Sequence, residues 1–254
     1  MTLPHTLMSA YRCVCFAAGL TLMNPLSATS AEPLHILPLG DSITQGGRSG
    51  RDEFSYRLPL FQLLTDAGVS FDFVGAQRGG LNADFTWPDY KGIPFDPDHE
   101  GHYGWKTAAV FDALPEWMPK WSAAPDIVLI HLGTNDMSSP DFARDIVAPL
   151  EGMIKLLREK NPRVVVLLGQ LSFNGGSALE IRPLVEALAQ RLDTPESPVR
   201  TVAHYEGWVE NSDLPDADTF DWAHPNPQGQ RKMAERWIEA MRPFVEALSK
   251  KSEK

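Results

Sequence analysis

Apolar and polar positions along this chain follow two alternating patterns. Short runs of branched apolar residues predict buried strands, and the longer stretches between them repeat their apolar residues every three or four positions, as helices do. The predicted strands cover residues 34–39, 71–74, 126–132, 163–168 and 198–203, and the predicted helices cover 56–67, 106–117, 142–160, 179–192 and 228–248. The last helix has an apolar face made of Met233, Trp237, Met241, Phe244 and Leu248. This alternation predicts an α/β fold in which a five-stranded parallel sheet lies between two layers of helices.

A long connection interrupts the alternation. Residues 76–104 are rich in Gly, Pro and Asp, and they include the aromatic residues Phe85, Trp87, Tyr90 and Phe95. A loop of this length inside a compact domain commonly has a function. Two interpretations remain open: the aromatic side chains pack on the domain, or some of them, including Trp87 and Tyr90, line a groove for substrate.

The first 31 residues differ from the rest of the chain. Arg12 is their only charged side chain, and the apolar run of residues 14–23 is followed by small residues at 27–31. The run is too short to span a bilayer comfortably, so the pattern predicts a signal peptide cleaved after Ser30 or Ala31. Residues 32–254 would then form one secreted or periplasmic domain. It would contain no disulfide, because Cys13 and Cys15 both precede the cleavage site.

The charge balance restricts the class of partner. The full chain has a formal charge of −10, and residues 32–254 have 22 basic and 33 acidic side chains, a formal charge of −11. Binding to nucleic acid requires a basic surface, so we expect no nucleic-acid partner. An anionic lipid surface is disfavoured for the same reason, and no stable membrane insertion is expected after signal cleavage. A neutral substrate fits best, and the composition leaves the oligomeric state open.

Residues whose side chains can take part in catalysis follow several of the predicted strands. In parallel sheets, ligands bind beyond the carboxyl ends of the strands, and Ser42 and Asn135 follow the first and third strands. Asp221 and His224 stand just before the last helix, at a spacing that lets the carboxylate accept the Nδ1 proton while Nε2 deprotonates a serine. The amide of Asn135 could donate to an oxyanion. Taken alone, Gly-Asp-Ser and Asp-x-x-His are more often a helix cap or a polar turn than catalytic motifs, and Asn135 and Asp136 could simply cap their own loop.

A metal site is the competing interpretation of the histidines. The run from Asp98 to His102 contains two histidines and a glutamate, but it lacks a His-Glu-x-x-His helix, and no cysteine supports it. His224 is the one histidine with a carboxylate at a spacing typical of a catalytic triad. We therefore expect no metal site.

Four blocks in order along the chain resemble those of the SGNH hydrolase superfamily. They are Gly40-Asp41-Ser42, Gly104, Gly133-Thr134-Asn135-Asp136, and Asp221 with His224. The resemblance implies a flavodoxin-like α/β/α sandwich in which Ser42 is the nucleophile, His224 the general base and Asp221 its orienting carboxylate. It also implies an oxyanion hole made of the N–H groups of Ser42 and Gly104 and the side chain of Asn135.

Residues 98–105 resemble one particular family within this superfamily. They are similar to the His-Glu-Gly-x-x-Gly-Trp run of carbohydrate esterase family three, the acetyl xylan esterase-like branch. The resemblance implies a secreted serine esterase that removes acetyl groups from carbohydrate such as xylan without a cofactor, and it adds His102 and Trp105 to Trp87 and Tyr90 as expected substrate contacts.

Three alternatives remain. The first is a lysophospholipase, thioesterase or arylesterase of the same superfamily, although the sequence shows neither an apolar lid nor a basic face for phospholipid. The second is a peptidoglycan O-acetyl esterase. The third is a carbohydrate-binding module that keeps the fold without catalysis.

Overall fold

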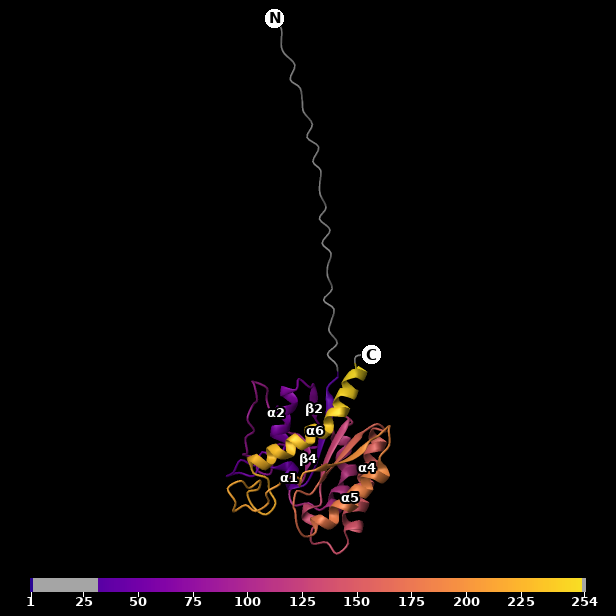
Figure 1. The fold of residues 1–254 in the computed structure, drawn as a ribbon. Coiled ribbons are helices and arrows are strands. Elements are labelled where there is room, and N and C mark those ends of the chain that lie inside the picture. The colour runs from indigo at the N-terminus through magenta and orange to yellow at the C-terminus, as the bar shows by residue number, and fades with distance from the viewer. Residues whose placement is uncertain (2–31, 253–254) are drawn as a thin grey trace. The chain divides into compact units, whose positions relative to one another are not determined.

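The computed structural model describes Met1 and residues 32–252, and its central element is a single seven-stranded sheet (Figure 1). Its strands are β1 (Leu34–Gly40), β2 (Phe71–Phe73), β3 (Gln77–Arg78), β4 (Asp98–Gly101), β5 (Ile127–His131), β6 (Val165–Gln170) and β7 (Val199–Ala203). The predicted signal peptide and both cysteines lie outside the described residues, apart from Met1, so that prediction stays open.

The sheet is parallel except at one edge. Its order is β3-β4-β1-β5-β6-β7, and β2 also pairs with β1. Strand β2 pairs with residues 34–36 of β1 and β4 pairs with Leu39 and Gly40, so the two share one edge of β1, while β3 runs antiparallel to β4. The five predicted strands are all present and parallel to their neighbours, which confirms the predicted fold class.

The segment predicted as a loop over residues 76–104 contains the two additional strands. Strand β4 continues the sheet beside the end of β1, and its His99 and Glu100 are completely buried. The prediction that His99 lies in a loop is therefore wrong. Sequence patterning did not show this strand because Asp98–Gly101 is short and polar, and its burial depends on hydrogen-bond partners far away in the chain.

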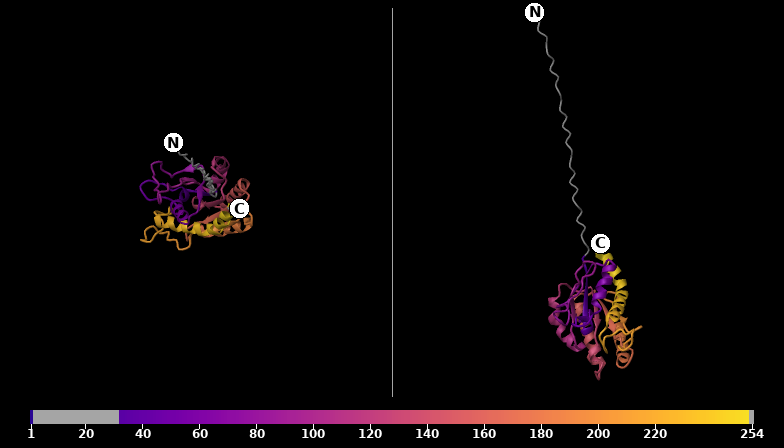
Figure 2. Two further views of the ribbon diagram at one scale, coloured as in Figure 1. Left: turned by 90° about the horizontal axis from the view of Figure 1, so that it is seen from above. Right: turned by 90° about the vertical axis from the view of Figure 1, so that its left-hand side faces the viewer.

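Helices cover both faces of the sheet. They are α1 (Ser42–Gln45), α2 (Arg57–Asp66), α3 (Thr107–Trp117), α4 (Ala148–Lys160), α5 (Ala178–Leu192) and α6 (Pro227–Ser252), with short turns η1 (Met118–Lys120), η2 (Thr134–Asp136) and a π-helical turn η3 (Ala143–Val147) before α4. In Figure 2 the yellow helix α6 lies along one side of the strands and the magenta region of α3 lies on the other.

Side-chain alternation along the strands divides the core into two layers. On β5, Ile127 and Leu129 face α2 and α6, whereas Val128 and Ile130 face α3, α4 and α5. A strand buried on both faces is apolar at every position, as expected between two helical layers. None of the helices in the described chain is both long and apolar enough to cross a bilayer.

Candidate active site

Ser42, His224 and Asp221 form a continuous line of hydrogen bonds at the carboxyl edge of the sheet. The Nε2 atom of His224 lies 3.0 Å from Ser42 Oγ, and its Nδ1 atom lies 3.0 Å from both carboxylate oxygens of Asp221. With Nδ1 protonated and facing the carboxylate, Nε2 is free to accept the serine proton. This arrangement can activate a serine for nucleophilic attack.

The turn after β1 sets the position of Ser42. Asp41 caps the short helix α1 by accepting the N–H of Ile43 at 3.0 Å, which makes Ser42 the first helical residue. Gly40 has an ordinary φ, and it is required here because a Cβ would collide with the Thr44 side chain and the His131 carbonyl. The glycine of the Gly-Asp-Ser block is therefore needed for space and not for an unusual backbone angle.

Asp41, which precedes Ser42, is itself fully buried. Burial raises its pKa to about 7, and the neighbouring Asp136 adds to the rise, although the hydrogen bond from Ile43 N–H opposes it. A carboxyl group that is partly neutral near pH 7 adds less negative charge next to Ser42 than a fully ionised carboxylate would.

The turn of residues 221–224 holds the carboxylate in place. Asp221 Oδ1 accepts the backbone N–H groups of Ala223 at 2.9 Å and His224 at 2.8 Å, in addition to the imidazole. Partial burial alone would raise the pKa of Asp221, but these hydrogen bonds and the His224 ring outweigh it and hold the pKa below its usual range. Asp221 therefore stays ionised throughout the pH range in which an esterase would act.

Arg51 is a further partner of this carboxylate that the sequence did not indicate. Its guanidinium donates to Asp221 Oδ2 at 3.0 Å and to the buried Glu53 at 2.5 Å, and it lies over the Phe220 ring. Arg51 belongs to a loop 170 residues away from Asp221 in sequence, so spacing could not reveal the contact. The ring of Tyr103, which was also not predicted, stacks on His224 with centroids 5.2 Å apart.

Three N–H donors lie on the loops that carry Ser42, Gly104 and Asn135. The backbone N–H groups of Ser42 and Gly104 have no acceptor among the described residues. The side chain of Asn135 donates one of its two amide hydrogens to the carbonyl of Trp105 at 2.9 Å, which orients it and leaves the other free. Gly104 has a φ of 78°, a conformation that glycine adopts without strain. Donors arranged in this way can stabilise an oxyanion.

The loops that carry Gly104 and Asn135 are tied together. Besides the bond from Asn135 to Trp105, the carboxylate of Asp136 accepts the N–H of Thr107 at 3.0 Å and its hydroxyl at 2.7 Å. The alternative that Asn135 and Asp136 only cap their own loop is therefore wrong, because both side chains bind the neighbouring one.

The side chain of His102 is held by contacts within the protein. It is buried, it binds Glu100 at 3.0 Å through Nε2, and it stacks on Trp117 with centroids 3.8 Å apart. Glu100 also accepts hydrogen bonds from Ala76 N–H and the Trp121 indole. Within the described residues, no three His, Cys, Asp or Glu side chains are arranged to hold a metal ion.

The other predicted substrate contacts are divided between two places. Trp105 is 39% exposed and follows Gly104 directly, beside the proposed oxyanion donors. Trp87 instead stacks on Phe95 with centroids 4.4 Å apart and contacts the Arg57 guanidinium, and Tyr90 donates to Asp66. The structure does not bring Trp87 and Tyr90 to Ser42. Their predicted role in substrate binding stays untested, and these contacts favour the packing interpretation.

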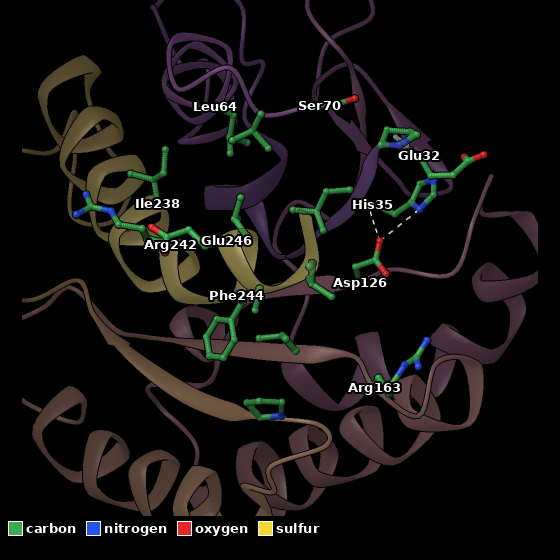
Figure 3. A pocket seen from close by; sticks show the side chains of 18 of the residues that line it. Glu32, His35, Leu64, Ser70, Asp126, Arg163, Ile238, Arg242, Phe244 and Glu246 are labelled. Atoms are coloured by element: carbon green, nitrogen blue, oxygen red, sulfur yellow. Dashed lines mark hydrogen bonds and ion pairs between the residues drawn. The ribbon is translucent and has the colours of Figure 1, made fainter. Parts of the chain in front are cut away.

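A cavity of about 1200 Å³ opens at the opposite edge of the sheet (Figure 3). It is lined by residues at the start of the strands and by the end of α6, including His35, Asp126, Ile238 and Phe244. None of the predicted site residues lines this cavity. The chemistry described above lies at the carboxyl edge, where ligands of parallel sheets ordinarily bind.

Comparisons with known proteins agree with this fold. Residues 39–232 match the GDSL-like lipase/acylhydrolase family. A multidomain esterase of Ruminococcus flavefaciens is 26% identical in an alignment of 244 positions that covers 88% of this chain, and the chain spans about 30% of that relative's length.

Two solved structures resemble the chain closely. A carbohydrate esterase family 3 structure from Talaromyces cellulolyticus has a TM-score of 0.69 and 27% identity, and the alignment covers 84% of this chain and 99% of the other. A mutant acetyl esterase with an acetate ion gives the same TM-score and identity and covers 85% and 99%. Since the family match extends over most of its length, the chain belongs to the GDSL-like lipase/acylhydrolase family, and the described domain is an esterase domain of that family.

Proposed function

We propose that this domain hydrolyses short acyl esters, chiefly acetyl groups on carbohydrate, through Ser42, His224 and Asp221. The observation that carries the proposal is the unbroken hydrogen-bond line from Asp221 through His224 to Ser42. The N–H groups of Ser42, Gly104 and Asn135 are the donors that would complete the site. This arrangement supplies every group that a serine esterase needs, and it argues against a catalytically silent binding module.

The acylation step follows from the geometry. Ser42 Oγ attacks the ester carbonyl carbon as its proton moves to His224 Nε2, and the carbonyl oxygen becomes an oxyanion held by Ser42 N–H, Gly104 N–H and the Asn135 amide. Asp221 stabilises the imidazolium that forms. The tetrahedral intermediate then collapses: the bond to the alcohol oxygen breaks, His224 returns its proton to that oxygen, and the alcohol leaves.

Deacylation repeats these roles with water. His224 takes a proton from a water molecule that attacks the acyl-enzyme, the same three donors hold the second oxyanion, and Ser42 leaves with the proton that His224 gives back. The products are the carboxylic acid and the free enzyme.

The preference for acetyl esters of sugars rests on several observations together. The similar solved structures include a carbohydrate esterase and an acetyl esterase with acetate, the domain is acidic, and an exposed tryptophan borders the oxyanion donors. A long acyl chain would need apolar burial worth about 0.8 kcal/mol per methylene to be selected. The lysophospholipase, thioesterase and arylesterase alternatives predict such burial.

A labelling experiment tests the nucleophile. We expect a fluorophosphonate probe to modify the wild type and not Ser42→Ala, because the variant retains the oxyanion donors but has no nucleophilic oxygen. Equal labelling of both proteins would show that another residue is the nucleophile.

A substrate series tests the ester. We expect kcat/KM to fall from p-nitrophenyl acetate through butyrate and octanoate to palmitate, and we expect acetate release from acetylated xylan. A profile that rises towards octanoate or palmitate, with no acetate released from xylan, would favour the lipid and thioester branch. Acetate release from O-acetylated peptidoglycan alone would favour the cell-wall alternative.

Export is part of the proposal. The sequence of residues 1–31 supports secretion or release into the periplasm. The full chain can be expressed in a secreting host and the exported protein sequenced from its amino terminus. We expect the mature protein to begin at Ala31 or Glu32.

A further inference from the structure

Two exposed tryptophans flank the proposed active site. The chain has seven tryptophans, and of these only Trp105 and Trp222 are exposed, at 39% and 63%. Trp222 is the most exposed of the large apolar side chains in residues 32–248. Trp105 follows Gly104, and Trp222 stands between Asp221 and His224. Exposed aromatic surface of this kind marks a binding site when it gathers around chemistry.

The position of Trp222 is fixed by its own turn and by a neighbouring ring. The adjacent N–H groups of Ala223 and His224 both donate to Asp221 Oδ1, which holds the turn rigidly. Its indole stacks on Phe173, with ring centroids 6.1 Å apart and planes 19° apart, and Phe173 is itself buried. The indole is thus held by a rigid turn and a buried ring while most of its surface remains in water. Such a preorganised surface loses little conformational entropy when a ligand covers it.

The reaction determines which part of the ester reaches Trp222. His224 must protonate the oxygen of the leaving alcohol, so the alcohol passes on the His224 side, whereas the carbonyl oxygen faces Gly104 and Asn135. Trp222 is two residues before His224 in the same turn. It therefore borders the alcohol part of the ester and not the acyl chain.

We propose that Trp222, supported by Phe173, is a stacking platform for the sugar ring whose hydroxyl carries the acetyl group. The inference rests on the proposed function and assigns to it the residue that recognises the alcohol. A pyranose presents a face of C–H groups that can lie flat on an indole, and it carries no charge that the acidic surface would repel.

The test compares two acetate esters that differ in the alcohol. One is an acetylated xylo-oligosaccharide and the other is ethyl acetate, whose alcohol is too small to cover the indole. For Trp222→Ala we expect kcat/KM on the sugar ester to fall at least tenfold more than on ethyl acetate, mainly through KM. Trp222→Phe, which keeps a flat ring, should recover most of the loss. Leu179→Ala, which removes a 55% exposed apolar side chain on α5, is the matched control and should leave kcat/KM unchanged for both substrates.

The outcomes separate the two proposals. Suppose that the wild type hydrolyses the sugar ester and that Trp222→Ala lowers kcat/KM equally for both substrates, or for neither. The proposal of a stacking platform is then wrong, while the proposed function stands. If the wild type hydrolyses ethyl acetate but no acetylated xylo- or cello-oligosaccharide, the carbohydrate part of the proposed function fails and the platform fails with it.

Discussion

At the scale of single residues, Asn135 illustrates how an ordinary amide becomes a selective donor. One of its hydrogens is bound to the Trp105 carbonyl, so the other points in a fixed direction. We expect Asn135→Ala to lower kcat by on the order of a hundred- to a thousandfold with a smaller change in KM, because the donor matters most when charge develops on the carbonyl oxygen. Steady-state kinetics on p-nitrophenyl acetate measure this, and an effect confined to KM would make Asn135 a substrate-binding residue.

Arg51 leads to a prediction about pH. Its positive charge, 3.0 Å from Asp221 Oδ2, partly offsets the negative charge that stabilises the imidazolium of His224. Removing it in Arg51→Gln should favour the imidazolium, so the acidic limb of the kcat/KM profile should move to higher pH by about half a unit to one unit, a modest shift because the pair is partly exposed.

The matched control for Arg51 is Arg48→Gln. Arg48 contacts the Tyr103 hydroxyl from the same loop and does not contact Asp221. Its profile should coincide with that of the wild type. An unmoved limb in Arg51→Gln would limit Arg51 to holding the buried Glu53.

At the scale of elements, the oxyanion donors depend on the connection between two loops. Thr107, the first residue of α3, donates twice to Asp136, which follows Asn135. We expect Thr107→Val, which keeps the shape and removes the hydroxyl, to lower the free energy of unfolding by about 1–3 kcal/mol and kcat by roughly tenfold. Urea unfolding and steady-state kinetics measure the two effects.

Thr65→Val is the control for that experiment. Its hydroxyl donates to the Phe61 carbonyl within α2 and contacts neither loop. It should leave kcat unchanged. If Thr107→Val loses stability but keeps full kcat, the connection supports the fold without positioning the donors.

The elements that the sequence predicted well are those whose signal is local. Strands β5 and β6 are continuous apolar runs, and the predicted face of α6 is confirmed: Met233, Trp237 and Met241 are all buried against the sheet. Such a pattern is visible in the sequence because the positions of apolar residues follow directly from which face of the helix or strand is buried. The Gly-Asp-Ser and Asp-x-x-His blocks were visible in the sequence for a similar reason, since each depends on a single short turn, and the structure places Ser42 Oγ and His224 Nε2 3.0 Å apart.

Features that depend on distant partners could not be predicted. Strand β4 is polar, and it is buried only because Glu100 binds Ala76, His102 and Trp121. Trp87 looked available for substrate, yet it packs near Arg57, a buried cation that donates to four backbone carbonyls. Neither contact follows from spacing, because each joins segments that approach one another only in the folded chain.

At the scale of the whole molecule, a buried pair of histidines links stability to pH. His131 at the end of β5 and His204 just after β7 are almost completely buried with ring centroids 5.6 Å apart, and neither ring has a hydrogen-bond partner among the described residues. Burial lowers the pKa of His131 to about 4, and burial together with His131 and Arg236 lowers the pKa of His204 well below its usual value. Both rings are therefore neutral in the folded protein near pH 7.

The sign of the effect follows from proton linkage. The unfolded chain binds protons at histidines near pH 6.5, whereas folded His131 binds its proton only near pH 4. Its contribution to stability is thus fully present above about pH 6.5 and is lost as the pH falls towards 4, on the order of 3 kcal/mol over that window. Asp41 acts in the opposite direction: because its pKa is raised to about 7, its contribution is lost as the pH rises. A single stability curve would mix the two.

Comparison with a variant separates them. Between pH 7 and pH 4 the free energy of unfolding of the wild type should fall more steeply than that of His131→Gln, because the variant has one fewer proton to take up on unfolding, while Asp41 contributes equally to both. Urea unfolding at half-unit pH steps measures the difference, and His35→Gln, which removes a partly exposed histidine, is the control. If His131→Gln does not fold, proton uptake on unfolding of the wild type, measured by calorimetry in buffers of different ionisation enthalpy, should increase between pH 7 and pH 5. Parallel stability curves for the wild type and His131→Gln, or proton uptake that falls between pH 7 and pH 5, would mean that His131 takes up its proton in the folded protein over the same pH range as in the unfolded chain.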